Sequence, residues 1–182
     1  TAGVRALQDR LIRDELGPLA DAYDHIEPLF IERVYRDVNG ASVWCDVLRS
    51  VKVETCSDIA RLALDDALVW VGEHYGTALE SLRWGDAHQA THAHSVLGDV
   101  PVLRYFVNIK QSTSGGDFTL QRGLSSGDPD HPFDNVHGAT YRGVYDFADP
   151  DSSVFISSTG QSGHFLSRHY ADLGQLWRRV EY

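Results

Sequence analysis

The sequence predicts an α+β chain in which helices come first and antiparallel strands follow. Apolar residues recur at helical spacing through residues 1–98, whereas from Pro101 they alternate along short segments separated by turn residues. Because helices and strands occupy separate stretches, a repeated βαβ unit with a parallel sheet is not expected. We expect residues 1–182 to form a single segment. Within it, residues 1–98 should be mainly helical and residues 99–182 mainly strands and loops with a short terminal helix.

Three helices are expected in the first part, because apolar residues recur there every three or four positions. Each helix is bounded by residues that start or stop helices, such as the Gly17-Pro18 pair and the N-cap candidate Ser57. The predicted helices cover residues 4–16, 18–38 and 58–75, and a short helix or turn follows over 83–92.

Four short strands are expected in the second part, where apolar and mixed positions alternate between turn-forming residues. They cover residues 101–109, 118–121, 140–147 and 154–158. Residues 123–138 are rich in Gly, Asp, Pro, Ser and His, which predicts a long loop. A short helix ending near Trp177 completes the segment.

Charge and hydropathy argue against two classes of partner. The 26 Asp and Glu residues outnumber the 16 Lys and Arg residues and give a formal net charge of −10. Because such a surface repels phosphate backbones, nucleic-acid binding is not expected. No apolar run is as long as a membrane span, so a membrane partner is not expected either. No signal peptide opens the sequence, an absence that means little if Thr1 is not the natural start.

The two cysteines, Cys45 and Cys56, do not form a C-x-x-C pair, so a zinc site or a thioredoxin-type redox site is weakly supported. They form one disulfide if the protein is exported, or they are two buried thiols. Their spacing alone does not decide between these alternatives.

Ser162 in the stretch Gly160-Gln161-Ser162-Gly163-His164 is the first candidate for chemistry. A nucleophile elbow requires G-x-S-x-G between a strand and a helix, because only small residues permit the tight turn. His164 stands where the second glycine belongs. We therefore interpret the stretch as a polar turn in which the serine bonds to nearby backbone.

Three histidines, His88, His92 and His94, are the second candidate. On a helix, His88 and His92 would share a face, and histidines at that spacing can bind zinc. A metalloprotease carries Glu after the first histidine, but Gln89 stands there, so that mechanism would lack its base. A structural or interface role is the favoured interpretation, and a histidine-based metal hydrolase is the alternative.

Asp117 and Thr1 complete the candidates. Asp117 follows two glycines at the start of an expected strand, where an acid could orient a catalytic histidine supplied from elsewhere or could simply cap its own loop.

An N-terminal threonine can act as a nucleophile whose own amine is the base, but that chemistry needs a terminus on a rigid strand. Thr1 precedes an amphipathic helix, so an exposed end is expected.

Five segments occur in an order that resembles the C-terminal part of the penicillin acylase family of N-terminal-nucleophile hydrolases. They are CSDIARLALDDALVWVGEHYG, LRWGDAHQATHAHSVLG, SGGDFTLQRG, GATYRGVYDF and STGQSGHFLSRHYADLGQLW. The specific combination is Trp84-Gly85-x-x-His88, Arg142-x-x-x-Asp146, and Gly160-Gln161-Ser162-Gly163 with Ser167 and His169-Tyr170-x-Asp172 through Trp177. The resemblance is close over residues 56–177 and loose over residues 1–52.

The resemblance implies a precursor cleaved into an α chain and a longer β chain that begins with a catalytic serine. That serine would attack a linear amide, such as an acylated β-lactam or an acyl-homoserine lactone, and form an acyl-enzyme with its own amine as base. Members of the family are typically exported to the periplasm, so the resemblance implies a periplasmic or secreted protein, and several members bind calcium through carboxylates that lie upstream of this segment. No cofactor is expected within the segment itself.

The serine-led strand of the family has no counterpart in this sequence. We therefore expect a C-terminal fragment of the four-layer αββα sandwich, inactive alone, whose partners are the α chain and the N-terminal part of the β chain. Asp117 is the candidate acid that supports a histidine outside this chain. The alternative from another class is a stand-alone binding or interaction domain, which would have no large exposed apolar patch.

Overall fold

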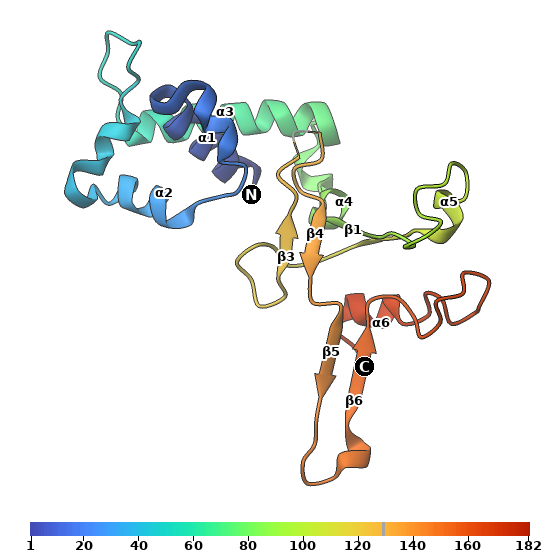
Figure 1. Cartoon of the computed structure of the whole chain (residues 1–182). Coiled ribbons are helices and arrows are strands. Elements are labelled where there is room, and N and C mark those ends of the chain that lie inside the picture. The colour runs from blue at the N-terminus through green and yellow to red at the C-terminus, as the bar shows by residue number, and fades with distance from the viewer. Residues whose placement is uncertain (129) are drawn as a thin grey trace. The chain divides into compact units, whose positions relative to one another are not determined.

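The computed structural model describes residues 1–128 and 130–182, which form two compact units, Thr1–Leu82 and Arg83–Tyr182. Both units are shown in Figure 1, and each is described here by itself. The predicted loop over 123–138 includes Pro129, which lies outside the described residues. The chain combines helices and sheets, so the α+β class is confirmed.

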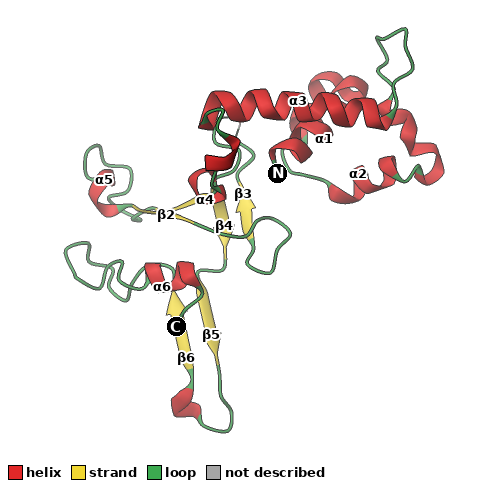
Figure 2. Cartoon of the chain, turned by 180° about the vertical axis from the view of Figure 1, so that it is seen from behind, coloured by secondary structure: helices red, strands yellow, loops and turns green. Residues whose placement is uncertain are grey.

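The first unit consists of helices (Figure 2). The α-helices are α1 (Ala2–Leu16), α2 (Pro28–Tyr35) and α3 (Cys56–Tyr75), and the 3₁₀ helices are η1 (Gly17–Ala22), η2 (Val38–Cys45) and η3 (Leu79–Ser81). Its core is the buried cluster Leu11, Val34, Cys45 and Ile59, to which Leu7, Phe30 and Trp44 add partly buried side chains. One residue from each of α1, α2, η2 and α3 therefore meets in the centre of the unit.

The single helix predicted over 18–38 is wrong, because an irregular stretch separates η1 from α2. Pro28 occupies the first turn of α2 and disfavours a helical residue before it. The buried side chain of Gln8 satisfies the backbone of this stretch. It donates to His25 O at 2.7 Å and accepts from Glu27 N at 2.6 Å.

The N-cap of α3 is Thr55 and not the predicted Ser57. Thr55 Oγ1 accepts from Asp58 N at 3.2 Å, and Thr55 N donates back to Asp58 Oδ2 at 3.1 Å, which completes a capping box. The bond that Thr55 N donates to the Asp58 carboxylate, followed by one from Thr55 Oγ1 to Oδ2 at 2.8 Å, holds the pKa of Asp58 below its ordinary value.

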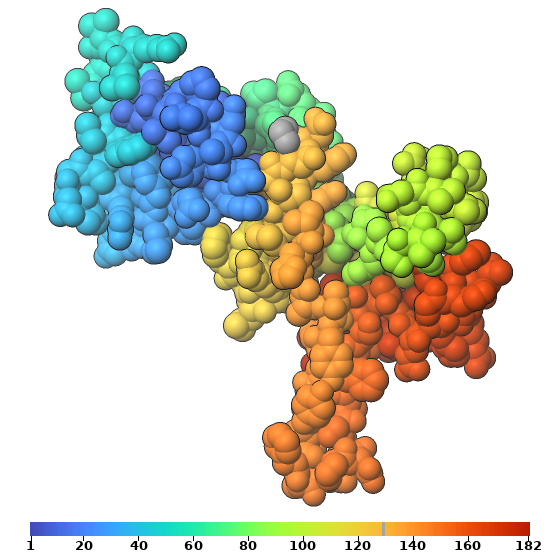
Figure 3. Space-filling view, viewed as in Figure 1, coloured from blue at the N-terminus to red at the C-terminus, as the bar shows by residue number. Residues whose placement is uncertain are grey.

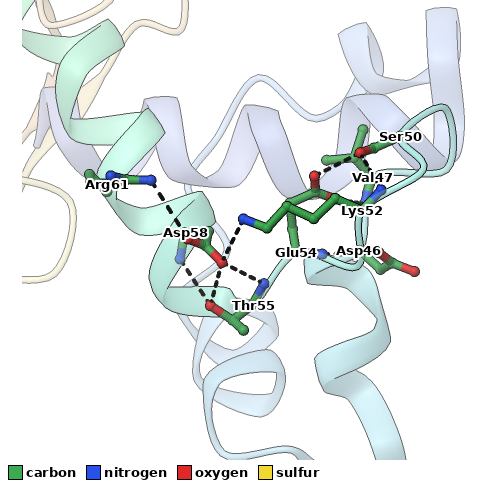
Figure 4. A network of polar contacts seen from close by, with 8 residues as sticks. All are labelled: Asp46, Val47, Ser50, Lys52, Glu54, Thr55, Asp58 and Arg61. Carbon is green, nitrogen blue, oxygen red and sulfur yellow. Dashed lines mark hydrogen bonds and ion pairs between the residues drawn. The ribbon is translucent and has the colours of Figure 1, made fainter.

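Cys45 and Cys56 form a disulfide with a Cα–Cα distance of 4.9 Å. The bond joins the end of η2 to the first residue of α3 and closes the loop 46–55, whose polar contacts are shown in Figure 4. Glu54 organises this loop, since its carboxylate accepts from Val47 N at 3.2 Å and from Ser50 Oγ at 2.8 Å. The residues of the loop (cyan) stand out from the helices of the first unit in Figure 3.

In the second unit, the described residues form two sheets and three short α-helices. The strands are β1 (Gln89–His92), β2 (Ile109–Ser112), β3 (Gly123–Ser125), β4 (Asn135–Gly138), β5 (Tyr141–Val144) and β6 (Val154–Ser157). The helices are α4 (Trp84–Ala87), α5 (Arg104–Val107) and α6 (Gly174–Arg179), with the 3₁₀ helix η4 (Pro150–Ser152) in the β5–β6 hairpin.

The larger sheet has the strand order β2-β1-β4-β3, so β3 lies at an edge. All pairs are antiparallel except β1 and β4, which run parallel through the pair Ala90↔Asn135. The prediction that all strands pair antiparallel is therefore wrong for β1 and β4. β5 and β6 form a separate antiparallel sheet.

Two strand assignments and one loop assignment made from the sequence are wrong. In the strand expected over 101–109, turns and α5 come before β2, which begins at Ile109. Residues 118–121 form a turn, and the expected loop over 123–138 contains β3 and β4. A strand over 101–109 would place Tyr105 and Val107 on one face and Phe106 on the other. Instead Val107 is buried, whereas Tyr105 and Phe106 are both about three-quarters exposed. β3 and β4 contain Gly, Asn and His residues with low strand propensity, and their pairing depends on tertiary context.

None of the helices in the described residues combines the length and the apolar composition that crossing a bilayer requires.

Candidate functional site

Asp117 lies in a loop that folds against the edge strand β3. Its two carboxylate oxygens each accept one hydrogen bond from Ser125, from the backbone N at 2.8 Å to Oδ1 and from Oγ at 2.9 Å to Oδ2. Ser125 is only 4% exposed, whereas Asp117 is half-buried. The carboxylate thus covers the outward N–H of an edge strand.

Two glycines allow this loop to fold back on itself. Gly115 has φ +84°, and a Cβ at that position would lie 1.8 Å from Gln121 O, so no side chain fits. Gly116 accepts from Gly123 N at 3.2 Å, which ties the loop to the first residue of β3. The Gly-Gly-Asp sequence is therefore explained by close backbone approach followed by a carboxylate that binds β3.

His88 is completely buried behind this loop. Its Nδ1 donates to Phe133 O at 2.7 Å, and its own carbonyl accepts from Thr113 N and Thr113 Oγ1, both at 2.9 Å. Trp84 stacks on the imidazole with a centroid distance of 4.7 Å. The Trp84-x-x-x-His88 spacing thus stacks two rings and joins α4 to the sheet.

The Nε2 atom of His88 has no hydrogen-bond partner among the described residues. It faces Gly123, where a Cβ would lie 2.5 Å from Nε2 and 2.7 Å from Nδ2 of Asn135. Gly123 is therefore required by the close packing of β3 against His88. A fully buried imidazole in this position supports the sheet and cannot touch a substrate.

The prediction that His88 and His92 share one face of a helix is wrong, because His88 is the C-cap of α4 and residues 89–92 form β1. His92 Nε2 accepts from Gln111 Nε2 at 2.8 Å, and His94 Nδ1 accepts from Val96 N and Leu97 N at 3.2 Å. Across residues 1–128 and 130–182, no group of three or more His, Cys, Asp or Glu side chains is arranged to hold a metal ion.

His92 lies beside Gln111 in the larger sheet, and Gln111 joins that sheet to Ser158, the residue that follows β6. The amide of Gln111 donates both to His92 Nε2 and to Ser158 O, each at 2.8 Å, so the neutral imidazole carries its proton on Nδ1. Burial lowers the pKa of His92 below its ordinary value and favours this neutral form. A pocket of about 160 Å³ lined by His92, Asn135 and Trp177 lies here, below the volumes typical of small-molecule sites.

Ser162 lies in a turn between β6 and α6. Its hydroxyl accepts from His164 N at 3.1 Å, and its backbone N donates to His169 O at 3.0 Å. This is the local backbone bonding expected of a polar turn. His169 Nδ1 bonds to Asp172 Oδ2 at 2.6 Å, but within the described residues no hydrogen bond joins the Ser162 hydroxyl to the His169 ring.

Arg142 and Trp177, two residues of the sequence motifs, contact each other between β5 and α6. The Arg142 Cζ lies 5.0 Å from the centre of the indole, and its Nη2 donates to Trp177 O. Trp177 Nε1 donates to Ala139 O at 3.1 Å. Desolvation by burial lowers the pKa of Arg142 below its ordinary value, whereas the contact with the indole face favours the charged guanidinium.

Thr1 is exposed and is the N-cap of α1, whose first N–H groups at Val4 and Arg5 bond to Thr1 O at 3.0 Å. This position at the start of a helix does not match the strand-borne N-terminal nucleophile considered from the sequence.

The contact of Ser125 with Asp117 could not be predicted from the sequence. Ser125 lies between Leu124 and Ser126 in a stretch with the composition of a loop, and only the folded loop brings it to Asp117.

These features describe an α+β segment in which polar contacts brace a sheet and a carboxylate is held at its edge. A family model described as penicillin amidase matches residues 1–182, and the chain belongs to the penicillin amidase family. It is similar to the penicillin acylase 2 proenzyme of Pseudomonas sp. (strain SE83), with 28% identity over 140 residues. The match covers 74% of this chain and 17% of that relative, so the chain spans less than a fifth of the relative's length.

Proposed function

We propose that this chain is the C-terminal part of an amidohydrolase that cleaves linear amides through an acyl-enzyme. The observation that carries the proposal is the family match over the whole chain, together with the small share of the acylase proenzyme that the chain represents. A serine at the start of the β chain, on another part of the precursor, would attack the amide carbonyl, and water would then release the acid. Acylated β-lactams and acyl-homoserine lactones are the substrate classes proposed.

Asp117 is proposed as the acid that supports a histidine on the remaining part of the enzyme. A buried or half-buried carboxylate beside an imidazole fixes its orientation and stabilises the imidazolium that forms during acyl transfer. Although both oxygens of Asp117 already accept bonds from Ser125, a carboxylate has about four acceptor positions, so capacity remains for an imidazole N–H.

The exposed apolar surface supports a partner from the same precursor. Large apolar side chains that are more than 70% exposed occur in both units and include Val51, Val53, Tyr105, Phe106, Leu120 and Phe147. Exposed apolar side chains in such number are typical of a surface that packs against another chain. A stand-alone binding domain is less well supported for the same reason.

Export to the periplasm or beyond the cell is proposed as the location. Disulfides persist in oxidising compartments, and the Cys45–Cys56 bond fits such a compartment.

The proposal is tested by producing residues 1–182 alone and together with the remaining parts of their precursor. We expect hydrolysis of a chromogenic phenylacetyl amide or of an acyl-homoserine lactone only by the complete, processed protein. Turnover by the purified chain alone would contradict its assignment as a non-catalytic part. Absence of turnover by the complete protein with both amide classes would contradict the assignment as an amidohydrolase.

A further inference from the structure

Ser125 donates two hydrogen bonds to a single carboxylate, one from the backbone and one from the side chain. The two donors bind different oxygens of Asp117, so the carboxylate can neither rotate about its last bond nor leave the edge of β3 without losing one of them. A single bond from Ser125 N to the carboxylate would suffice to cover the edge-strand N–H, so the second bond, from the Ser125 hydroxyl, is not needed for that purpose.

The local sheet geometry directs Ser125 toward Asp117. The register of β3 on β4 shifts between Leu124, which pairs with His137, and Ser125, which pairs with Asn135. Such a bulge changes the direction of the strand and re-aims the side chains beside it. Because β3 is the edge strand, the N–H of Ser125 is free to point out of the sheet, where the Asp117 loop lies.

Ser125 is itself held in place by buried neighbours. It is 4% exposed, and its partner Asn135 donates from Nδ2 to Thr113 Oγ1 at 3.1 Å. Thr113 in turn bonds to the carbonyl of the fully buried His88, which packs against Gly123 at the start of the same strand. The donor pair therefore belongs to a braced part of the sheet, while the carboxylate it holds is half-buried and is followed in the chain by the exposed residues Phe118 and Leu120.

We propose that Ser125 is a positioning residue, which fixes the carboxylate of Asp117 in the orientation that receives a catalytic histidine from the remaining part of the enzyme. This inference rests on the proposed function. It assigns Ser125 no contact with substrate, since the residue acts only through Asp117.

The test uses the complete, processed enzyme and four variants, Ser125→Ala, Ser125→Thr, Asp117→Asn and the Ser125→Ala/Asp117→Asn double variant. Active sites are counted from the burst of a chromogenic leaving group, so that losses in folding or processing do not enter kcat. Ser114→Ala is the matched control, because Ser114 lies in the same loop but its hydroxyl bonds to Gln121 Oε1 at 2.9 Å on the exposed side.

We expect Ser125→Ala to lower kcat per active site by up to about 100-fold with little change in KM, as misplacement of a supporting group does. The double variant should have the same kcat per active site as Asp117→Asn alone, since both substitutions disrupt the same pair of Ser125–Asp117 hydrogen bonds. Ser125→Thr, which keeps the hydroxyl, should recover most of kcat, and Ser114→Ala should match the unsubstituted enzyme.

Full kcat per active site in Ser125→Ala, with only a lower melting temperature, would overturn the inference while Asp117→Asn remains impaired. Additive losses in the double variant would overturn it as well. Full activity of Asp117→Asn would instead overturn the role proposed for Asp117, and an unsubstituted enzyme inactive toward amides would overturn the proposed function itself.

Discussion

Gly160 and Gly163 belong to one motif but differ in what a side chain would meet. A Cβ on Gly160 would lie 2.1 Å from His169 O and 2.7 Å from the carbonyl carbon of Tyr170, whereas a Cβ on Gly163 meets nothing within 4 Å. At the scale of single residues, the motif therefore contains one glycine required for packing beside one that is not. In the same loop, the hydroxyl of Tyr170 donates a hydrogen bond to Val107 O, which joins the loop to the last residue of α5.

We expect Gly160→Ala to destabilise the protein by about 1–3 kcal/mol or more, because backbone atoms cannot yield as a flexible side chain does. Gly163→Ala should change the unfolding midpoint little and serves as the control. Thermal or denaturant unfolding of the complete protein measures both. Equal effects of the two substitutions would contradict the close approach seen at Gly160.

At the scale of elements, the disulfide connects two segments that no regular secondary structure links. Cys45 is 1% exposed and belongs to the core of the first unit, while Cys56 begins α3. The bond therefore fixes the start of α3 against η2 as well as closing the loop between them.

Removing this bond by the Cys45→Ser/Cys56→Ser double substitution should lower the free energy of unfolding by about 2–4 kcal/mol, because the unfolded chain loses a constraint. A reducing agent should lower the unfolding midpoint of the unsubstituted protein and leave that of the double variant unchanged. If the reductant leaves both proteins unchanged, the two cysteines are not bonded in the folded protein.

The burial of His92 gives the stability of the fold a dependence on pH. Its pKa is lowered in the folded protein by burial, so the unfolded chain binds the proton more readily. The neutral ring therefore stabilises the fold at pH values above about 6.5, the ordinary pKa of histidine, and this contribution is lost as pH falls below that value.

We expect the unfolding midpoint to fall between pH 7.5 and pH 5.5 by more in the unsubstituted protein than in a His92→Gln variant. Both proteins keep their carboxylates ionised over most of this range, which separates the effect of His92 from that of the acids. Identical pH dependence of the two proteins would show that His92 is not buried as described.

Sequence reasoning succeeded where the signal was local. Gly17 and Gly76 mark the ends of α1 and α3, and the ends of the β5–β6 hairpin follow from turn residues around Pro150. It failed where distant contacts decide the structure. β3 and β4 contain residues such as Gly123 that disfavour strands, and Ser125 reaches Asp117 only after the loop has folded back.

At the scale of the whole molecule, the chain divides into two units whose apolar side chains are widely exposed. Among the described residues, the first has a small buried cluster around Leu11 and Ile59, and the second buries apolar side chains such as Val107, Phe133 and Ile156. Such an organisation fits the proposal that both units complete their packing against other parts of one precursor.

The most direct measurement is to trap the acyl-enzyme of the complete protein with a slowly released amide substrate and to locate the acyl group by peptide mass spectrometry. We expect the acyl group to lie on a serine outside residues 1–182, and a Ser162→Ala variant to be acylated to the same extent per folded molecule. An acyl group on Ser162 or on Thr1, or loss of acylation in correctly processed Ser162→Ala, would contradict this expectation.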